Sequence, residues 1–148
     1  MAPLITLLVA GIVARVVGWL GVAYVNSWSA SIAVGLAAMF VLTGTAHFAP
    51  RLRADLIAIV PPRLPAPGVL VTITGLLELL GAVGLVLPVT RVAAALCLLA
   101  LMLAMFPANV YAARMPNPPA SMTTRLSVRT VVEVVFLAAT VTVAIGHG

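Results

Sequence analysis

The sequence contains no lysine, only three acidic residues and a single cysteine in 148 residues. Charged residues make up 7% of the chain and apolar residues 64%, whereas a soluble domain is about half apolar and roughly a quarter charged. So little polar surface excludes a water-soluble globule and a disordered tail. With Cys97 alone, a disulfide scaffold and Cys-x-x-Cys chemistry are also excluded, and we expect Cys97 to be a small core residue.

Motifs for several common activities are also missing. No G-x-S-x-G sequence and no phosphate-binding loop occur. The only histidines are His47 and the terminal His147, without metal-ligand spacing, so we expect no metal site. The net charge of +5 comes from eight arginines scattered singly, with no basic stripe and no aromatic stacking platform. This pattern argues against nucleic-acid binding, and arginines in short loops instead act as orientation signals in a membrane.

Long apolar runs fill most of the chain. Because crossing the hydrocarbon takes about 20 apolar residues per helix, the sequence predicts an all-α integral membrane protein, a compact bundle of four to five transmembrane helices in one domain, 1–148. The predicted spans are about 4–25, 30–48, 66–88, 91–112 and 126–146.

The first run needs its own argument because it resembles a signal peptide. It lacks a basic start, carries Arg15 in its middle and is followed by no A-x-A-like site, so we expect it to remain as a helix. An arginine at a helix centre costs about 2.5–3.5 kcal/mol on the insertion scale. Arg15 is therefore expected to find an acidic partner; should 4–25 fail to span, four helices remain.

The loops suggest an orientation. Residues near 50–60 place Leu52, Leu56 and Ile59 on one helical face, which predicts a short amphipathic interfacial segment ended by Pro61-Pro62. Most of the arginines fall in the loops 50–65 and 114–125, which share one side of a five-span bundle. The positive-inside rule makes that side, and the N-terminus, cytoplasmic.

Polar residues inside or at the ends of the spans are the strongest functional signal, because ionisable groups in hydrocarbon are costly and face the bundle interior. Glu78 lies among small residues, so its carboxyl is expected to point at another helix, where a structural ion pair with Arg15 is one interpretation. Arg129 and Glu133 are neighbours at i, i+4 and could pair likewise. The candidates for contacts to a bound molecule are His47, Glu78, Asn109, Tyr111, Arg129 and Glu133.

Up-and-down threading brings several of these groups to the arginine-rich side. The ends of the second and fourth spans and the start of the fifth meet there, which predicts a cavity under the 50–65 loop that opens toward that side. For single residues two interpretations stay open. His47 is either a helix-end hydrogen bonder or a ligand-binding group, and Asn109 either satisfies carbonyls freed by Pro107 or faces a ligand.

The polar pattern over residues 44–111 resembles the DoxX-like family of small bacterial membrane proteins. The matching stretches are GTAHF at 44–48, IVPPRLP at 59–65, TGLLELLG at 74–81, PVTR at 88–91 and FPANVY at 106–111. In such relatives the last helix often has Gln four residues after Arg, whereas Glu133 follows Arg129 here. A titratable acid thus replaces a neutral amide.

The resemblance implies a helical bundle in the bacterial cytoplasmic membrane and a link to membrane redox chemistry. Without a cysteine pair, such a role here would mean binding a quinone or another lipid, or docking a redox partner. His47, Glu78 and Glu133 match or neighbour the family's polar positions and are the candidates for headgroup contacts.

Three functions remain open at this point. The first is an accessory subunit that binds a lipophilic, quinone-like molecule. The second is a structural or assembly subunit, as a homo-oligomer or with a membrane partner. The third is a small intramembrane enzyme, an isomerase or an epoxide-opening cyclase, with Glu78 or Glu133 as general acid and His47 as proton partner.

Overall fold

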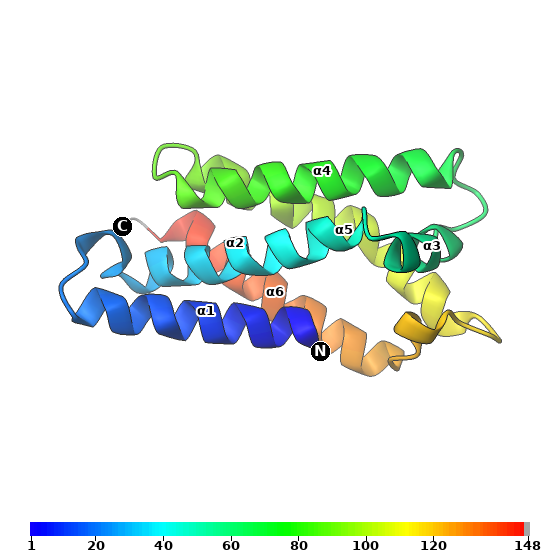
Figure 1. Cartoon of the computed structure of the whole chain (residues 1–148), viewed down its shortest axis with the longest axis horizontal. Helices are drawn as coiled ribbons and strands as arrows, with labels where there is room; N and C mark the ends of the chain where they lie inside the picture. Colours follow the sequence, from blue (N-terminus) through cyan, green and yellow to red (C-terminus); the bar gives the residue numbers. More distant parts are fainter. Residues whose placement is uncertain (147–148) are drawn as a thin grey trace.

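The fold is a bundle of α-helices, as predicted. We describe it from a computed structural model covering residues 1–146, so His147 lies outside the described residues. Within 1–146 there is no β-strand. The elements are α1 (Ala2–Trp19), η1 (Ala23–Val25), α2 (Trp28–Ala46), α3 (Pro50–Ala58), α4 (Pro67–Val86), α5 (Arg91–Arg114), η2 (Ala120–Met122) and α6 (Leu126–Ile145) (Figure 1).

Local chemistry sets the ends of these helices. Pro50 and Pro67 start α3 and α4, where the missing N–H costs nothing, and Ser27 caps α2 by accepting a hydrogen bond from Ala30 N. The first helix ends at Trp19 and not near residue 25 as predicted. Gly21 has φ +108°, a conformation that breaks the helix, and the chain returns through η1.

Helix α2 is the centre of the bundle. It packs against α1, α4 and α6, while α5 contacts α4 and α6, so that α2, α4, α5 and α6 form a ring and α1 lies outside it against α2. The buried core draws on all five long helices, including Leu7, Leu36, Leu85, Leu98 and Val143. The ring can therefore enclose a site that α1 borders only at its N-terminal end.

The outward faces of the long helices are apolar. Large side chains such as Leu80, Val83 and Val131 are more than half exposed, and five helices are long and apolar enough to cross a membrane. The chain is therefore a multi-pass membrane protein. Cys97 also lies on this outer surface, so the expected core position is wrong. Cys97 is two residues from the buried Ala95, which is about 200° of helix rotation, so it faces the opposite side of α5.

Different segments form the two ends of the bundle (Figure 1). At the arginine-rich end lie α3, the loop 59–66 and the segment 115–125. The N-terminus lies toward the same end, because Met1 borders a surface cavity with Ser121 and Arg129. At the opposite, aromatic end lie the loops 20–27 and 87–90 with Trp19, Tyr24 and Trp28. This relative arrangement agrees with the predicted threading.

Close packing of α1 on α2 depends on glycine. A Cβ at Gly35 would lie 2.6 Å from the carbonyl oxygen of Leu7, a backbone atom that cannot move aside cheaply. At Gly11, in the same interface, a Cβ would lie 3.6 Å from the carbonyl oxygen of Ser31, which is ordinary contact. In lipid, where apolar area alone gives little association, such close approach supplies the packing energy.

We predict opposite effects of alanine at these two glycines. Gly35→Ala should destabilise the protein by about 1–3 kcal/mol through overpacking. Gly11→Ala should leave stability unchanged or raise it by about 0.5–1 kcal/mol, because alanine favours the helix. Unfolding in detergent followed by circular dichroism measures both, and a Gly35→Ala protein as stable as the wild type would contradict the packing described.

Candidate functional site

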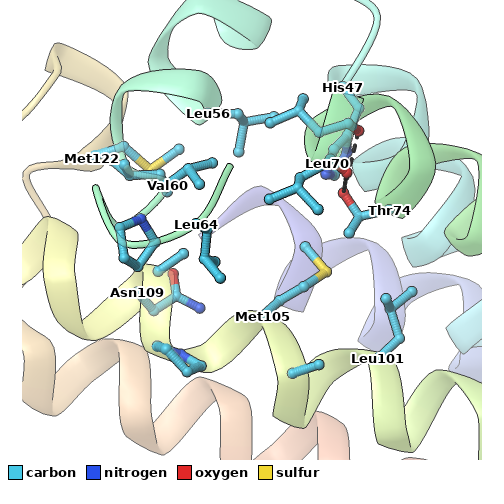
Figure 2. A pocket seen from close by; sticks show the side chains of 16 residues that line it. His47, Leu56, Val60, Leu64, Leu70, Thr74, Leu101, Met105, Asn109 and Met122 are labelled. Carbon is cyan, nitrogen blue, oxygen red and sulfur yellow. Dashed lines mark hydrogen bonds between the residues drawn. The ribbon is translucent and has the colours of Figure 1, made fainter. Parts of the chain in front are cut away.

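Two adjoining cavities lie toward the arginine-rich end. The α4–α5 cavity, of about 280 Å³, is roofed by α3 and the loop after it and walled by the facing halves of α4 and α5 (Figure 2). The central cavity, of about 300 Å³, lies inside the ring of α2, α4, α5 and α6. Both are mainly apolar. The residues that line both are His47, Leu56, Met105, Asn109 and Met122.

The central cavity contains the contact between α2 and α4. The Thr43 hydroxyl donates a hydrogen bond of 2.5 Å to Oε2 of Glu78, so the Glu78 carboxyl points at another helix, as predicted. The helices come close because both carry glycine at the crossing: a Cβ at Gly75 would lie 2.5 Å from His47 Cβ, and one at Gly44 would lie 3.2 Å from the carbonyl oxygen of Gly75. Small residues thus place Glu78 and His47 on the cavity walls.

His47 follows the last residue of α2 and is only 4% exposed. Its Nδ1 lies 2.9 Å from the carbonyl oxygen of Thr43. Because a carbonyl only accepts, Nδ1 carries the proton, and in the neutral ring Nε2 is left as an acceptor. Burial lowers the pKa of His47 below its ordinary 6.5. The hydrogen bond to Thr43 opposes this, and the nearby Arg53 lowers the pKa further. His47 is therefore the neutral, Nδ1-protonated form at pH 7.

Arg53 ties α3 to the ends of α2 and α4. Its guanidinium donates to the carbonyl oxygens of His47 and Gly68, at 3.1 and 3.0 Å, and to the Thr72 hydroxyl at 2.9 Å. The predicted amphipathic segment is thus a helix. It is held as a roof over the cavities, with Leu56 facing them.

Asn109 is oriented by Arg129. Nη1 of Arg129 donates to Oδ1 of Asn109 at 2.9 Å. Since an arginine has no acceptor, this contact identifies the amide oxygen and leaves Nδ2 of Asn109 as a donor. No hydrogen bond from Nδ2 is found within residues 1–146, so capping of carbonyls freed by Pro107 is not what the structure shows. Across the cavity from Asn109 lie His47, Leu70 and Thr74 (Figure 2).

Arg129 also holds the segment after α5 over the site. It donates to the carbonyl oxygens of Met122 and Thr124 at 2.6 and 2.9 Å, and Ser121 donates to Asp55 Oδ2 at 2.5 Å. The expected pair of Arg129 with Glu133 is therefore wrong. The i, i+4 spacing made the two neighbours, but the tertiary acceptors on the loop and on α5 take the guanidinium.

Glu133 lines the central cavity together with Glu78 and His47. Its Oε1 is buried and has no hydrogen-bond partner among the described residues, which costs about 1–3 kcal/mol. Tyr111, the remaining candidate, is not among the residues that line these cavities. It lies two positions beyond Asn109, about 200° around α5.

Arg15 lies far from this site. At the aromatic end, its Nη1 donates to the carbonyl oxygen of Asn26 at 2.7 Å, and its guanidinium lies 5.0 and 5.2 Å from the ring centres of Trp19 and Trp28. The expected acidic partner is therefore wrong for Arg15. Its partners come from the turn that Gly21 creates, which helix periodicity does not reveal.

Sequence reasoning did not single out several residues of the site. Thr43 is the hydrogen-bond donor to Glu78, and its i, i+4 spacing to His47 was the available signal. The apolar lining by Leu56, Met105 and Met122 could not be distinguished from ordinary core or lipid-facing residues.

Residues 36–144 match a family described as a domain of unknown function (DUF8561). The chain belongs to this family, since the match covers well over half of it. The match includes all the residues discussed on the two cavities and leaves out α1. No curated protein and no solved structure matches the chain.

The depressed pKa of His47 predicts a pH-dependent stability. The unfolded chain takes up a proton at pH values where folded His47 does not, so stability falls as pH drops below about 6.5 and is constant above it. We expect His47 to lower the midpoint of thermal unfolding between pH 7.5 and pH 5, so that the midpoint falls further, or rises less, with His47 than in His47→Gln. Both proteins carry His147→Gln, which removes the other histidine, and the difference between them isolates the titration of His47. An equal drop with and without His47 would contradict the assignment.

Proposed function

We propose that this protein is an accessory subunit of the bacterial cytoplasmic membrane that binds a lipophilic molecule with a quinone-like head. The observation that carries the proposal is the wall shared by the two cavities. There, Asn109 offers a fixed donor and His47 a fixed acceptor to a space that is otherwise apolar. Apolar pockets with few oriented polar groups are the usual form of a small-molecule site.

The available polar atoms suit the head of a quinone. A ring carbonyl accepts hydrogen bonds, which Nδ2 of Asn109 can donate, and the hydroxyl of a reduced ring donates, which Nε2 of His47 can accept. Glu133 also lines the central cavity and adds a carboxyl group as a further acceptor there. The two adjoining volumes, about 280 and 300 Å³, together fall in the range of small-molecule pockets, and their apolar walls suit a ring with a short length of tail.

The position of the site in the membrane supports such a ligand. The cavities lie beneath α3 and the segment 115–125, close to one surface of the bilayer. By the positive-inside rule that surface, with the N-terminus, is cytoplasmic. A lipophilic molecule can reach this depth from the hydrocarbon while its head stays near the interface.

The resemblance to DoxX-like proteins supports a redox context. A chain with Cys97 alone carries out no dithiol exchange, so its part would be to hold a quinone or to dock a redox protein at the arginine-rich surface. The acid at position 133, where such relatives often have an amide, would add a titratable group beside the head.

The matched substitution Asn109→Asp tests whether Nδ2 of Asn109 donates a hydrogen bond to the ligand. It keeps an oxygen for Arg129 and replaces Nδ2 by an acceptor, with almost no change of shape. We expect roughly tenfold weaker equilibrium binding of a short-chain benzoquinone to protein in nanodiscs, the effect of one lost hydrogen bond. Asn117→Asp, the same change at an exposed position of the segment 115–125, should bind like the wild type.

Two results would count against the proposal. One is wild-type protein that neither retains an extractable quinone or lipid on purification nor binds the probe. The other is unchanged affinity in Asn109→Asp.

A second candidate is an intramembrane enzyme, an isomerase or epoxide-opening cyclase. It is favoured by one observation: Glu78, Glu133 and His47 line the same central cavity, which brings acid and base groups to an apolar substrate. Incubation with lipid extracts distinguishes the two, because an enzyme forms a product that Glu78→Gln and Glu133→Gln abolish, whereas a binding subunit returns the ligand unchanged.

A further inference from the structure

The aromatic end of the bundle carries two arginines, Arg15 and Arg91, that have no acidic side chain beside them within residues 1–146. The three acidic side chains of the sequence are all elsewhere: Asp55 bonds Ser121 at the arginine-rich end, Glu78 bonds Thr43, and Glu133 lines the central cavity. Arg15 and Arg91 are both only partly exposed. Each is a cation beside hydrocarbon without an acidic side chain as counterion.

Both guanidinium groups are held by the loop 20–27 and the helices beside it. Nη1 of Arg15 donates to Asn26, and Trp19 and Trp28 lie against its guanidinium. Nε of Arg91 donates to the carbonyl oxygen of Leu85 at 3.1 Å, and its guanidinium lies 5.4 Å from the ring centre of Tyr24. Tyr24 in turn donates to the carbonyl oxygen of Val86. The loop therefore fixes the positions of both cations.

These contacts leave hydrogen-bonding capacity unused. Nε of Arg15 and Nη2 of Arg91 are enclosed without a partner in the described part of the chain. Arg15 Nη2 and Arg91 Nη1 are not enclosed, and neither donates within residues 1–146. Each arginine therefore keeps one accessible nitrogen and a full positive charge for an outside group.

The surrounding residues define the depth of that group. Trp19 and Trp28 are 63% and 61% exposed and Tyr24 is 41% exposed, and exposed Trp and Tyr gather at the level of the lipid headgroups. At this depth the abundant anions are the phosphates of lipids, which guanidinium binds through paired N–H groups. Every phospholipid carries a phosphate, but only an anionic phospholipid brings a net negative charge to act as counterion for Arg15 and Arg91.

We propose that Arg15 and Arg91, presented by the loop 20–27 and its aromatic side chains, bind the phosphate of anionic phospholipids at this end of the protein. The site is separate from the two cavities. It is made partly by α1, which lies outside the matched family region.

The protein carries its own reporter for this site. Its only two tryptophans both lie against Arg15, so quenching of tryptophan fluorescence by brominated lipids reports binding at this end alone. Full-length protein is reconstituted in phosphatidylcholine with increasing brominated phosphatidylglycerol, or with brominated phosphatidylcholine as the neutral comparison. We expect phosphatidylglycerol to bind more tightly than phosphatidylcholine, by about fivefold for each arginine near the surface.

Variants assign the preference to the arginines. In Arg15→Gln/Arg91→Gln the preference should fall to near one, while Arg15→Lys/Arg91→Lys should keep most of it. Arg51→Gln/Arg63→Gln removes the same charge from exposed positions at the arginine-rich end and should leave the quenching unchanged. The lysine variant and the wild-type comparison remain informative even where the glutamine variant fails to fold.

Three results would overturn the proposal. Equal quenching by the two lipids in the wild type means that no anionic lipid is selected. A preference that survives in Arg15→Gln/Arg91→Gln means that these arginines only anchor the loop. Loss of the preference on adding inorganic phosphate, but not chloride at equal ionic strength, means that the site takes a free anion and not a lipid.

Discussion

The contact between the last turn of α2 and the middle of α4 sets the geometry of the cavities. Hydrocarbon offers no hydrogen bonds, so the carboxyl of Glu78 must be satisfied from inside the bundle, and Thr43 does this directly. One turn later the carbonyl oxygen of the same Thr43 accepts from His47. Gly44 and Gly75 permit the approach that both bonds require. A larger residue at Gly75 would displace His47 and with it the wall of both cavities.

Around that contact, the arginines donate hydrogen bonds to backbone carbonyl oxygens and do not form ion pairs with acidic side chains. Arg53 and Arg129 together donate to the carbonyl oxygens of His47, Gly68, Met122 and Thr124. Three of these carbonyls, of His47, Met122 and Thr124, lie at the C-terminal end of a helix or in a loop, where the backbone has no partner within a helix. Arginine suits this task because its planar group spreads several donors over neighbouring acceptors. This explains how the four partly buried arginines, Arg15, Arg53, Arg91 and Arg129, are accommodated without acidic partners. The other four arginines are exposed.

The five spans, the amphipathic α3 and the inward direction of Glu78 could be predicted from sequence, because each depends on composition or local spacing. The partners of Arg15 and Arg129 could not. Both are tertiary: one depends on the turn at Gly21, the other on the segment 115–125 folding back over α5 and α6. The predictions for Cys97 and Tyr111 failed for another reason. The long helices are apolar nearly all round, so the pattern does not indicate which side faces the bundle.

The two ends of the molecule use polar groups in different ways. At the arginine-rich end, Asn109 and His47 each use one polar atom in a hydrogen bond to the protein. The remaining atoms, a donor on Asn109 and an acceptor on His47, favour a neutral molecule with both donors and acceptors. At the aromatic end, Arg15 and Arg91 keep donors and charge, which favours an anion. The three acidic side chains lie at the arginine-rich end and in the middle of the bundle, so none of them pairs with Arg15 or Arg91. The different ligands that we propose for the two ends therefore follow from which polar atoms each end leaves without a partner in the protein.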